Sequence, residues 1–276
     1  MGYAIRVVGD ERVDLGAIDP RGDGKIERTV GEERFRKLAG ELGELQELLY
    51  AAGSESVLIV LQGLDTSGKD GTIRHVFSEV NTQGTRVVAF KVPTAQERAH
   101  DFLWRIHPHT PERGAMVIFN RSHYEDVLVA RVHDLVPEEV WRARYAHINA
   151  FERLVTDSGT ILVKFYLHIS KEEQEERLLA REHDVAKAWK LSSADWIERR
   201  SWGDYIAAFE DALRECNAPH APWYVVPADR KWLRNLAVAE VLVDALRPHR
   251  ERWLAALRER GNAELAAIRA ARETAD

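Results

Sequence analysis

The sequence predicts an α/β protein in which a parallel sheet is covered by helices on both faces. Two observations carry this prediction. Short apolar runs rich in β-branched residues alternate along the chain with longer segments whose apolar residues recur at helical spacing. The short runs are also continuously apolar, which is typical of strands buried on both faces. We therefore expect a three-layer α/β/α sandwich.

Length and composition indicate one large domain. The 276 residues are 45% hydrophobic and 30% charged, enough to bury about three quarters of the surface that the unfolded chain exposes. No apolar run approaches the ~18 residues of a membrane span, and a net charge of −6 argues against nucleic-acid binding through overall basicity. The N-terminus lacks the apolar core of a signal peptide, and one cysteine allows no internal disulfide, so we expect a cytoplasmic protein.

The strands and helices follow from these patterns in chain order. Strands are expected where the apolar runs end in polar residues or proline: 56–62, 86–91, 115–119, 160–168 and 223–227. Helices are expected at about 32–52, 69–80, 94–104, from 122, 137–156, from 170, 193–216, 229–246 and 249–272. Thr94 and Ser122 each stand three residues before a glutamate and predict capping boxes. The stretch from Ser170 to Glu173 is expected to cap the next helix, and Asp229 the helix after it.

The stretch 58–72 predicts a phosphate-binding loop between a buried strand and a helix. Gly63 is followed by four residues, then by Gly68 and Lys69, a spacing that lets backbone N–H groups, the helix N-terminus and the lysine converge on an anion. The position after the lysine usually holds Ser or Thr, but here it is Asp70, and a further carboxylate, Asp65, lies inside the loop. We interpret the stretch as a P-loop variant that binds phosphate through Mg²⁺ with Asp65 as a metal ligand. The alternative is a glycine-rich turn with a structural aspartate.

A second group of polar residues follows the strand at 115–119. Arg121 stands at the carboxyl end of that strand, where ligands bind in open α/β sheets, and Asp126 lies in the next helical turn. We expect Arg121 to bind phosphate oxygens in a bidentate manner and Asp126 to share Mg²⁺ with Asp65. Alternatively, Asp126 only complements the helix dipole, and Glu125 is assigned to the capping box.

The segment at about 180–200 breaks the helical pattern and is interpreted as a lid. Arg181, Lys187 and Lys190 could close from it over a phosphate, although Arg181 could also be a solvated charge on a helix face. Asp195 is assigned to helix capping. The predicted organisation is an N-terminal arm at 1–31, a P-loop nucleotide-kinase-like domain at 32–247 that includes the lid, and a C-terminal helical tail at 248–276.

Four stretches together resemble the polyphosphate kinase 2 family, in the same order over about residues 32–247. They are 63–72 (GLDTSGKDGT), 101–105 (DFLWR), 119–129 (FNRSHYEDVLV) and 221–229 (APWYVVPAD). The resemblance implies a thymidylate-kinase-like fold with a lid, and Mg²⁺-dependent phosphate transfer between inorganic polyphosphate and nucleotides. It assigns Asp65 and Asp126 to metal binding and catalysis, and Lys69, Arg121 and Arg181 to phosphate binding.

The stretch 119–129 looks most like the subgroup that acts on nucleoside mono- and diphosphates, so AMP and ADP are the expected acceptors. GMP and GDP should also be accepted, because no residue is visibly committed to a base edge. A homo-oligomer, dimer or tetramer, is expected. One alternative is an ATP-dependent nucleoside monophosphate kinase, and Asp65 and Asp70 argue against it. The other is a non-catalytic sensor of polyphosphate or nucleotide.

The candidate residues fall into two overlapping sets. The catalytic candidates are Asp65, Lys69, Arg121 and Asp126. The phosphate- and nucleotide-binding candidates add residues of the loop and the lid: Gly63, Gly68, Asp70, Gly71, Thr72, Arg181, Lys187 and Lys190.

Overall fold

The strands of the computed structural model form one mixed sheet. The structure describes residues 2–9, 13–22, 24, 26–185, 189 and 191–273. Within these residues the six strands lie in the order β1-β6-β5-β2-β4-β3. They are β1 (Ile5–Arg6), β2 (Ser56–Gln62), β3 (Thr85–Ala89), β4 (Met116–Asn120), β5 (Thr160–His168) and β6 (Trp223–Pro227). The five strands β2 to β6 pair with their neighbours in parallel, which confirms the predicted class. Strand β1 of the N-terminal arm pairs antiparallel with β6 at one edge of the sheet.

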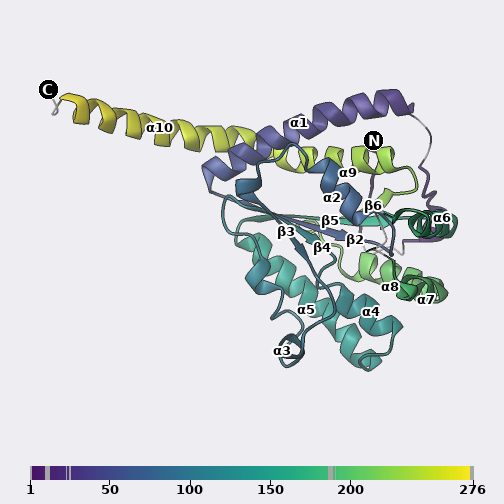
Figure 1. The fold of residues 1–276 in the computed structure, drawn as a ribbon. Helices are drawn as coiled ribbons and strands as arrows, with labels where there is room; N and C mark the ends of the chain where they lie inside the picture. Colours follow the sequence, from purple (N-terminus) through teal and green to yellow (C-terminus); the bar gives the residue numbers. More distant parts are fainter. Residues whose placement is uncertain are drawn as a thin grey trace.

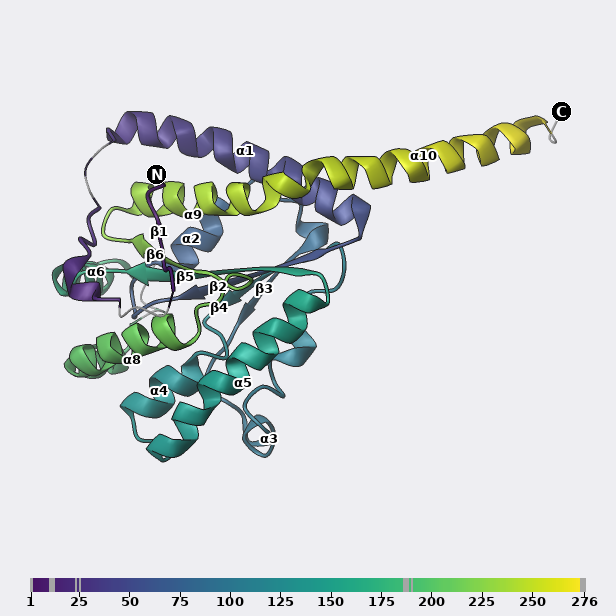
Figure 2. The same cartoon turned by 180° about the vertical axis from the view of Figure 1, so that it is seen from behind.

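Helices cover both faces of the sheet (Figures 1 and 2). Helices α1, α2 and α9 lie on one face, and α4, α5 and α8 lie on the other. The α-helices of the described chain are α1 (Arg28–Ala52), α2 (Lys69–Val76), α3 (Ala95–Arg98), α4 (Glu125–Val132), α5 (Glu138–Asp157), α6 (Lys171–Glu182), α7 (Ser193–Glu198), α8 (Trp202–Glu215), α9 (Lys231–Leu246) and α10 (Arg250–Glu273). Short 3-10 turns are η1 (Leu15–Ala17), η2 (Thr82–Gly84), η3 (His107–His109), η5 (Arg199–Ser201) and η6 (Arg247–His249).

The central strand β2 divides the core into two clusters. Every residue of β2 is buried, and because successive side chains point to opposite faces, Leu58 and Val60 join one cluster while Val57 and Ile59 join the other. The first cluster packs on α4, α5 and α8, and the second on α1 and α9. No described helix combines the length and the apolar character that crossing a membrane requires.

Several helix boundaries differ from the prediction. The helix expected at 32–52 begins at Arg28, and the helix expected at 69–80 ends at Val76. The helix expected at 94–104 has the predicted capping box at Thr94, but it ends at Arg98, and Asp101 then accepts a hydrogen bond from the Leu103 N–H and forms a turn. The helix expected at 193–216 is divided into α7, η5 and α8. In η5, between these two helices, the Arg199 side chain donates to the Lys171 carbonyl at the start of α6. Local sequence patterns do not predict such a contact between distant elements.

Two of the predicted caps are also wrong. The Ser122 hydroxyl accepts from the Tyr124 N–H, and α4 begins at Glu125 without a side-chain cap. Asp229 does not cap α9; it accepts hydrogen bonds from the Ser170 N–H and hydroxyl, each at 2.8 Å. Ser170 caps α6 as predicted.

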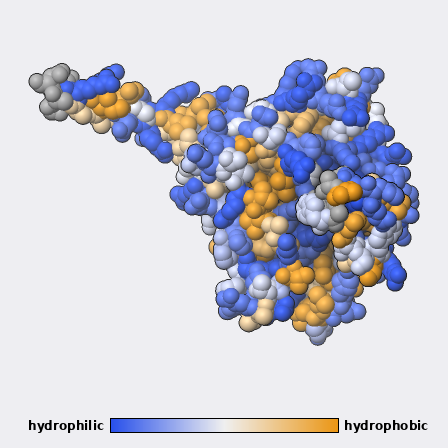
Figure 3. All heavy atoms as spheres, viewed as in Figure 1, coloured by the Kyte–Doolittle hydropathy of each residue, from blue (hydrophilic) through white to orange (hydrophobic). Residues whose placement is uncertain are grey.

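Helix α10 begins on the body of the protein and then projects away from it (Figures 1 and 2). Trp253 is fully buried and donates to Glu55 at 2.6 Å, and Arg260 donates to the carbonyls of Ala51 and Ala52 at the end of α1. From residue 258 to residue 272 every residue is exposed. Apolar and hydrophilic residues alternate along this projecting part (Figure 3).

Candidate active site

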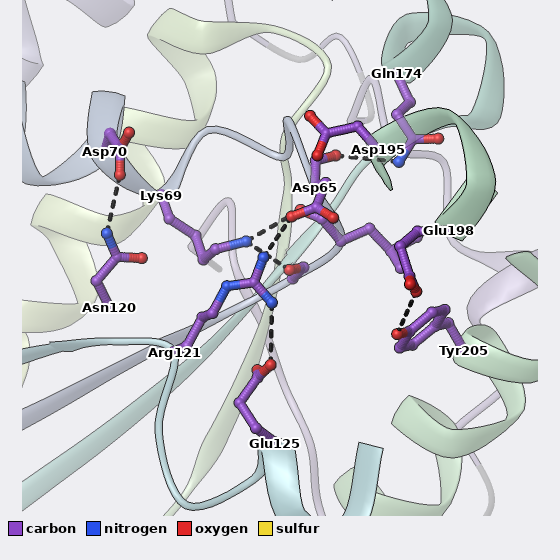
Figure 4. A network of polar contacts seen from close by, with 12 residues as sticks. Asp65, Lys69, Asp70, Asn120, Arg121, Glu125, Gln174, Asp195, Glu198 and Tyr205 are labelled. Atoms are coloured by element: carbon purple, nitrogen blue, oxygen red, sulfur yellow. Dashed lines mark hydrogen bonds and ion pairs between the residues drawn. The ribbon is translucent and has the colours of Figure 1, made fainter. Parts of the chain in front are cut away.

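The ends of β2 and β4 bring the P-loop and Arg121 together. The two strands pair in parallel with Leu61 opposite Asn120, and the Arg121 N–H donates to the Leu61 carbonyl at 3.1 Å. Arg121 therefore lies at the carboxyl edge beside the loop that follows β2 (Figure 4). Its backbone has φ 63°, as does that of Thr66 inside the loop, a left-handed conformation that non-glycine residues rarely adopt. The site is thus built on two sharp turns at neighbouring strand ends.

Lys69 lies folded back across its own loop. Its ammonium group donates to the carbonyls of Gly63 at 2.6 Å and Leu64 at 3.1 Å. Burial, together with the charge of Arg121, lowers the pKa of Lys69 to about 8. Gly63 and Gly68 have φ angles of +150° and +103°, which glycine alone adopts readily. The loop therefore holds a cation against carbonyl oxygens, a position from which it can turn to phosphate oxygens.

Arg121 bridges two carboxylates. Its guanidinium contacts Asp65 from the P-loop and donates to Glu125, one helical turn further along the chain, at 3.0 Å. Burial opposes the charged guanidinium, but Glu125 and Asp65 outweigh it and raise the pKa of Arg121. The assignment of Glu125 to a capping box is wrong, and its spacing of four residues from Arg121 is the sequence signal for this pair.

Asp70 joins the P-loop helix to β4. Its carboxylate accepts a hydrogen bond from the Asn120 amide at 2.9 Å. On the same helix the Thr72 hydroxyl donates to the Gly68 carbonyl at 3.1 Å, and Gly71 lies between these two residues. Asp70 and Thr72 thus hold the first turn of α2 in place against its neighbours.

Asp126 lies close to two arginines that do not belong to this cluster. Its carboxylate lies 3.5 Å from Arg144 and 4.0 Å from Arg105. Burial raises its pKa despite both arginines. In the part of the chain that the structure describes, no hydrogen bond or ion pair joins Asp126 to Arg121, so its sharing of a metal with Asp65 stays a prediction.

The carboxylate of Asp65 fits a divalent cation that arrives with a phosphate. Its side chain is 27% exposed and lines a pocket with Gly63, Arg121 and Glu125. Among the described residues, no group of three or more His, Cys, Asp or Glu side chains could hold a metal. Mg²⁺ is commonly held by only one or two carboxylates together with substrate phosphates, so this donor set suits Mg²⁺ bound with substrate better than a metal that the protein holds alone.

Helix α6 supports the P-loop from the side opposite β4. Arg177 donates to the carbonyls of Thr66 at 2.9 Å and Ser67 at 3.2 Å. The same guanidinium donates to the carbonyls of Ala228 and Asp229 after β6, and the Gln174 amide donates to the Asp65 carbonyl at 3.1 Å. Arg177 therefore ties the loops after β2 and β6 to one helix, a role that its helical spacing to Arg181 does not reveal.

The segment expected to be a lid contributes Glu198 and Arg199 to the lining of the pocket. Arg181 donates to Asp195 of α7 at 3.1 Å, so Asp195 is an ion-pair partner here, and Glu198 of the same helix lines the pocket and accepts from Tyr205 at 2.7 Å. Lys187 and Lys190 lie outside the described residues. The pocket volume is about 30 Å³, room for about one water.

A buried polar network supports the turn that carries Arg121. Lys164 of β5 and Glu152 of α5 are buried and lie 2.5 Å apart. Glu152 also accepts from the Tyr124 hydroxyl at 2.7 Å and lies 3.2 Å from the imidazole of His123. Burial lowers the pKa of His123, so the imidazole is held neutral. These contacts fix residues 123 and 124, two and three positions after Arg121, to two neighbouring elements.

Comparison with known proteins gives one consistent result. Residues 25–252 match the family described as polyphosphate kinase 2. The AMP/ADP-polyphosphate phosphotransferase of Meiothermus ruber is 50% identical over 243 residues, 87% of this chain and 91% of that protein. The ADP-polyphosphate phosphotransferase of Rhodopseudomonas palustris is 43% identical over 88% of each chain. The crystal structure of polyphosphate kinase 2 from Arthrobacter aurescens TC1 superposes with a TM-score of 0.82 at 39% identity, covering 89% of this chain and 92% of that one.

Proposed function

This chain belongs to the polyphosphate kinase 2 family, and from that premise we propose that it phosphorylates AMP to ADP and ADP to ATP with inorganic polyphosphate and Mg²⁺. It is an enzyme, a polyphosphate:nucleotide phosphotransferase. In the forward direction an oxygen of the acceptor's last phosphate attacks the terminal phosphorus of polyphosphate. The bond from that phosphorus to the chain breaks, and the chain leaves one phosphate shorter. The reaction is reversible.

One observation carries the assignment of the site: the Arg121 guanidinium lies between the P-loop carboxylate of Asp65 and Glu125. Phosphoryl transfer depends mainly on positioning and on neutralising the charge of the moving group. In the free protein the Arg121 guanidinium donates its hydrogen bonds to the two carboxylates. The Lys69 ammonium donates to two carbonyls of the loop. We propose that both cations turn to phosphate oxygens when substrate binds.

The chain's own residues divide the work in this proposal. Lys69 and the loop N–H groups bind one phosphate group, Arg121 holds the transferring group by two parallel hydrogen bonds, and Arg177 keeps the loop in shape. Asp65 would hold Mg²⁺, which when bound neutralises part of the phosphate charge. A second metal contact from Asp126, and phosphate contacts from Arg181, Lys187 and Lys190 on a closing lid at about 180–200, are part of the same proposal.

The breadth of acceptors follows from what the site recognises. The candidate residues at the sheet edge are cations and carboxylates suited to phosphate and metal, so we propose that GMP and GDP are accepted as well. A preference of about tenfold for one base would correspond to about 1.4 kcal/mol, the scale of one base-edge hydrogen bond. We also propose a homo-oligomer, dimer or tetramer; the exposed Leu265 and Ile268 on α10 favour association between copies.

The test is a time course without ATP. Purified protein is incubated with Mg²⁺, polyphosphate and AMP, or GMP in a parallel series, and nucleotides are separated by chromatography. ADP should form first and ATP should follow. ADP that accumulates without ATP at excess polyphosphate would contradict the use of diphosphates. Phosphorylation of AMP only after ATP is added would instead favour an ATP-dependent nucleoside monophosphate kinase.

A further inference from the structure

Arg234 is a buried cation placed against the outer side of the P-loop. It lies in the first turns of α9 and is 2% exposed. A Cβ atom on Gly68 would lie 1.9 Å from its Nη1 atom, and one on Gly71 would lie 3.2 Å from its Nη2 atom. The guanidinium therefore touches the backbone at the N-terminus of α2. A side chain at position 68 would displace this guanidinium, and the φ of +103° there also favours glycine.

No acidic side chain of the described chain pairs with Arg234. Its Nε and Nη2 atoms donate to the Asn235 amide oxygen at 3.2 and 2.8 Å. Burial, and after it the neighbouring charge of Arg177, lower the pKa of Arg234 to about 10. Arg177 differs because it pairs with Glu173 at 2.8 Å and donates to four backbone carbonyls.

A buried cation without a counter-charge destabilises the free protein. Such a residue is expected to persist where a ligand supplies the missing negative charge. The N-terminus of α2 is the place where backbone N–H groups and the helix dipole attract an anion. No side chain caps that N-terminus, because its N-cap residue is Gly68. The charge of Arg234 and the backbone N–H groups of the loop would thus both attract an anion at the N-terminus of α2.

We propose that Arg234 is an electrostatic positioning residue for the phosphate chain: its charge, acting through the P-loop backbone, strengthens binding of a condensed phosphate at the N-terminus of α2. The inference rests on the proposed function, because it needs an anionic ligand at the loop. That ligand is a chain of linked phosphates, which either polyphosphate or a nucleotide supplies. Arg234 does not touch the substrate in this arrangement.

The test compares a variant that keeps the charge with one that removes it. Binding of inorganic tripolyphosphate, and separately of ADP, is measured by calorimetry for wild type, Arg234→Lys and Arg234→Gln at fixed ionic strength and Mg²⁺. Arg234→Lys should stay within about threefold of wild type, whereas Arg234→Gln should bind about tenfold more weakly. The anion that shows the loss identifies the source of the phosphate chain at the loop. Arg258→Gln, which removes an exposed charge on α10, is the control and should change neither affinity.

Thermal unfolding supplies a second readout that a structural role would not give. Without phosphate ligands, Arg234→Gln should unfold at the wild-type temperature or above it, and the rise in Tm on adding tripolyphosphate or ADP should shrink. Arg177→Met, which loses the carbonyl contacts, should unfold at a lower temperature. If Arg234→Gln lowers the Tm of the free protein and binds both anions as wild type does, Arg234 is only structural. Equal losses of affinity in the Lys and Gln variants would also overturn the proposal.

The two hypotheses fail in different ways. If wild type binds neither tripolyphosphate nor ADP, the proposed function is wrong. If wild type binds one of them and Arg234→Gln binds it equally well, only the role of Arg234 is wrong.

Discussion

Asp65 combines two tasks that a single substitution can separate. Its carboxylate neutralises Arg121 in the free protein and is the proposed Mg²⁺ ligand during transfer. The ion pair is about one-third exposed on either side, with 35% for Arg121 and 27% for Asp65, and such pairs contribute at most about 1 kcal/mol to stability. Loss of a charged metal ligand beside a transferring phosphate should therefore lower the turnover rate far more than it lowers the free energy of unfolding.

Asp65→Asn should therefore lower turnover by at least about 100-fold and change the free energy of unfolding by no more than about 1 kcal/mol. Both are measured on one preparation, by the coupled formation of ADP and by urea unfolding. Asp157→Asn removes an exposed carboxylate that pairs with Arg153 on α5 and should leave turnover unchanged. Near-normal turnover of Asp65→Asn at the same Mg²⁺ concentration would remove Asp65 from the transfer site.

At the scale of elements, the residues that follow strands could be predicted and the contacts between distant helices could not. The bounds of β2, β5 and β6 are those predicted, because fully buried strands are continuous apolar runs that end at polar or proline residues. Placing strand ends at one edge was enough to bring Asp65 and Arg121 together. Arg177 of α6 contacts the P-loop across more than 100 residues of chain. Asp195 of α7 contacts Arg181 across a break between two helices.

The buried network between α5, β5 and the turn after β4 predicts how stability depends on pH. Burial lowers the pKa of His123 below its ordinary value of 6.5, so below about pH 6.5 the unfolded chain binds a proton that the folded protein does not. The unfolding free energy then decreases as the pH falls, by up to about 1.4 kcal/mol per pH unit for one proton. The stability that neutral His123 provides is complete above pH 6.5 and is lost as the pH falls below it.

This dependence is measured by urea unfolding between pH 7.5 and pH 5.5. His123→Gln cannot titrate, so its unfolding free energy should fall less steeply with decreasing pH than that of wild type. Lys164 and Glu152 remain as an ion pair in both proteins. Identical slopes for wild type and His123→Gln would show that the imidazole of His123 takes up its proton in the folded state as readily as in the unfolded chain.

At the scale of the whole molecule, the projecting part of α10 is separate from the transfer site. The site lies near α6 and α7, whereas α10 leaves the body on the opposite side (Figure 1). The anchors of α10, Trp253 and Arg260, both lie before residue 262, and every residue from there to 272 is exposed. Removal of residues from 262 onward should therefore leave turnover per chain within about twofold and the free energy of unfolding within about 1 kcal/mol, since no buried side chain is lost.

The comparison is made on steady-state turnover and urea unfolding of full-length and shortened protein. A shorter form that also lacks Trp253 should unfold far more easily, because a fully buried tryptophan typically contributes about 3–5 kcal/mol. A large loss of turnover on removal of residues 262–276 alone would mean that the exposed part of α10 acts on the site, for example by holding copies of the chain together. Sedimentation velocity of the shortened protein would detect such a loss of assembly.

The left-handed backbone at Thr66 and Arg121 has a consequence for laboratory evolution. A non-glycine residue in that conformation is disfavoured by about 1 kcal/mol, so glycine at either position relieves strain. A population of variants selected only for survival on heating should accumulate these glycines, and the one at position 121 would remove the guanidinium proposed to bind phosphate. Selection for heat resistance and selection for turnover would therefore drive residue 121 in opposite directions, and a screen that rewards both should retain Arg121.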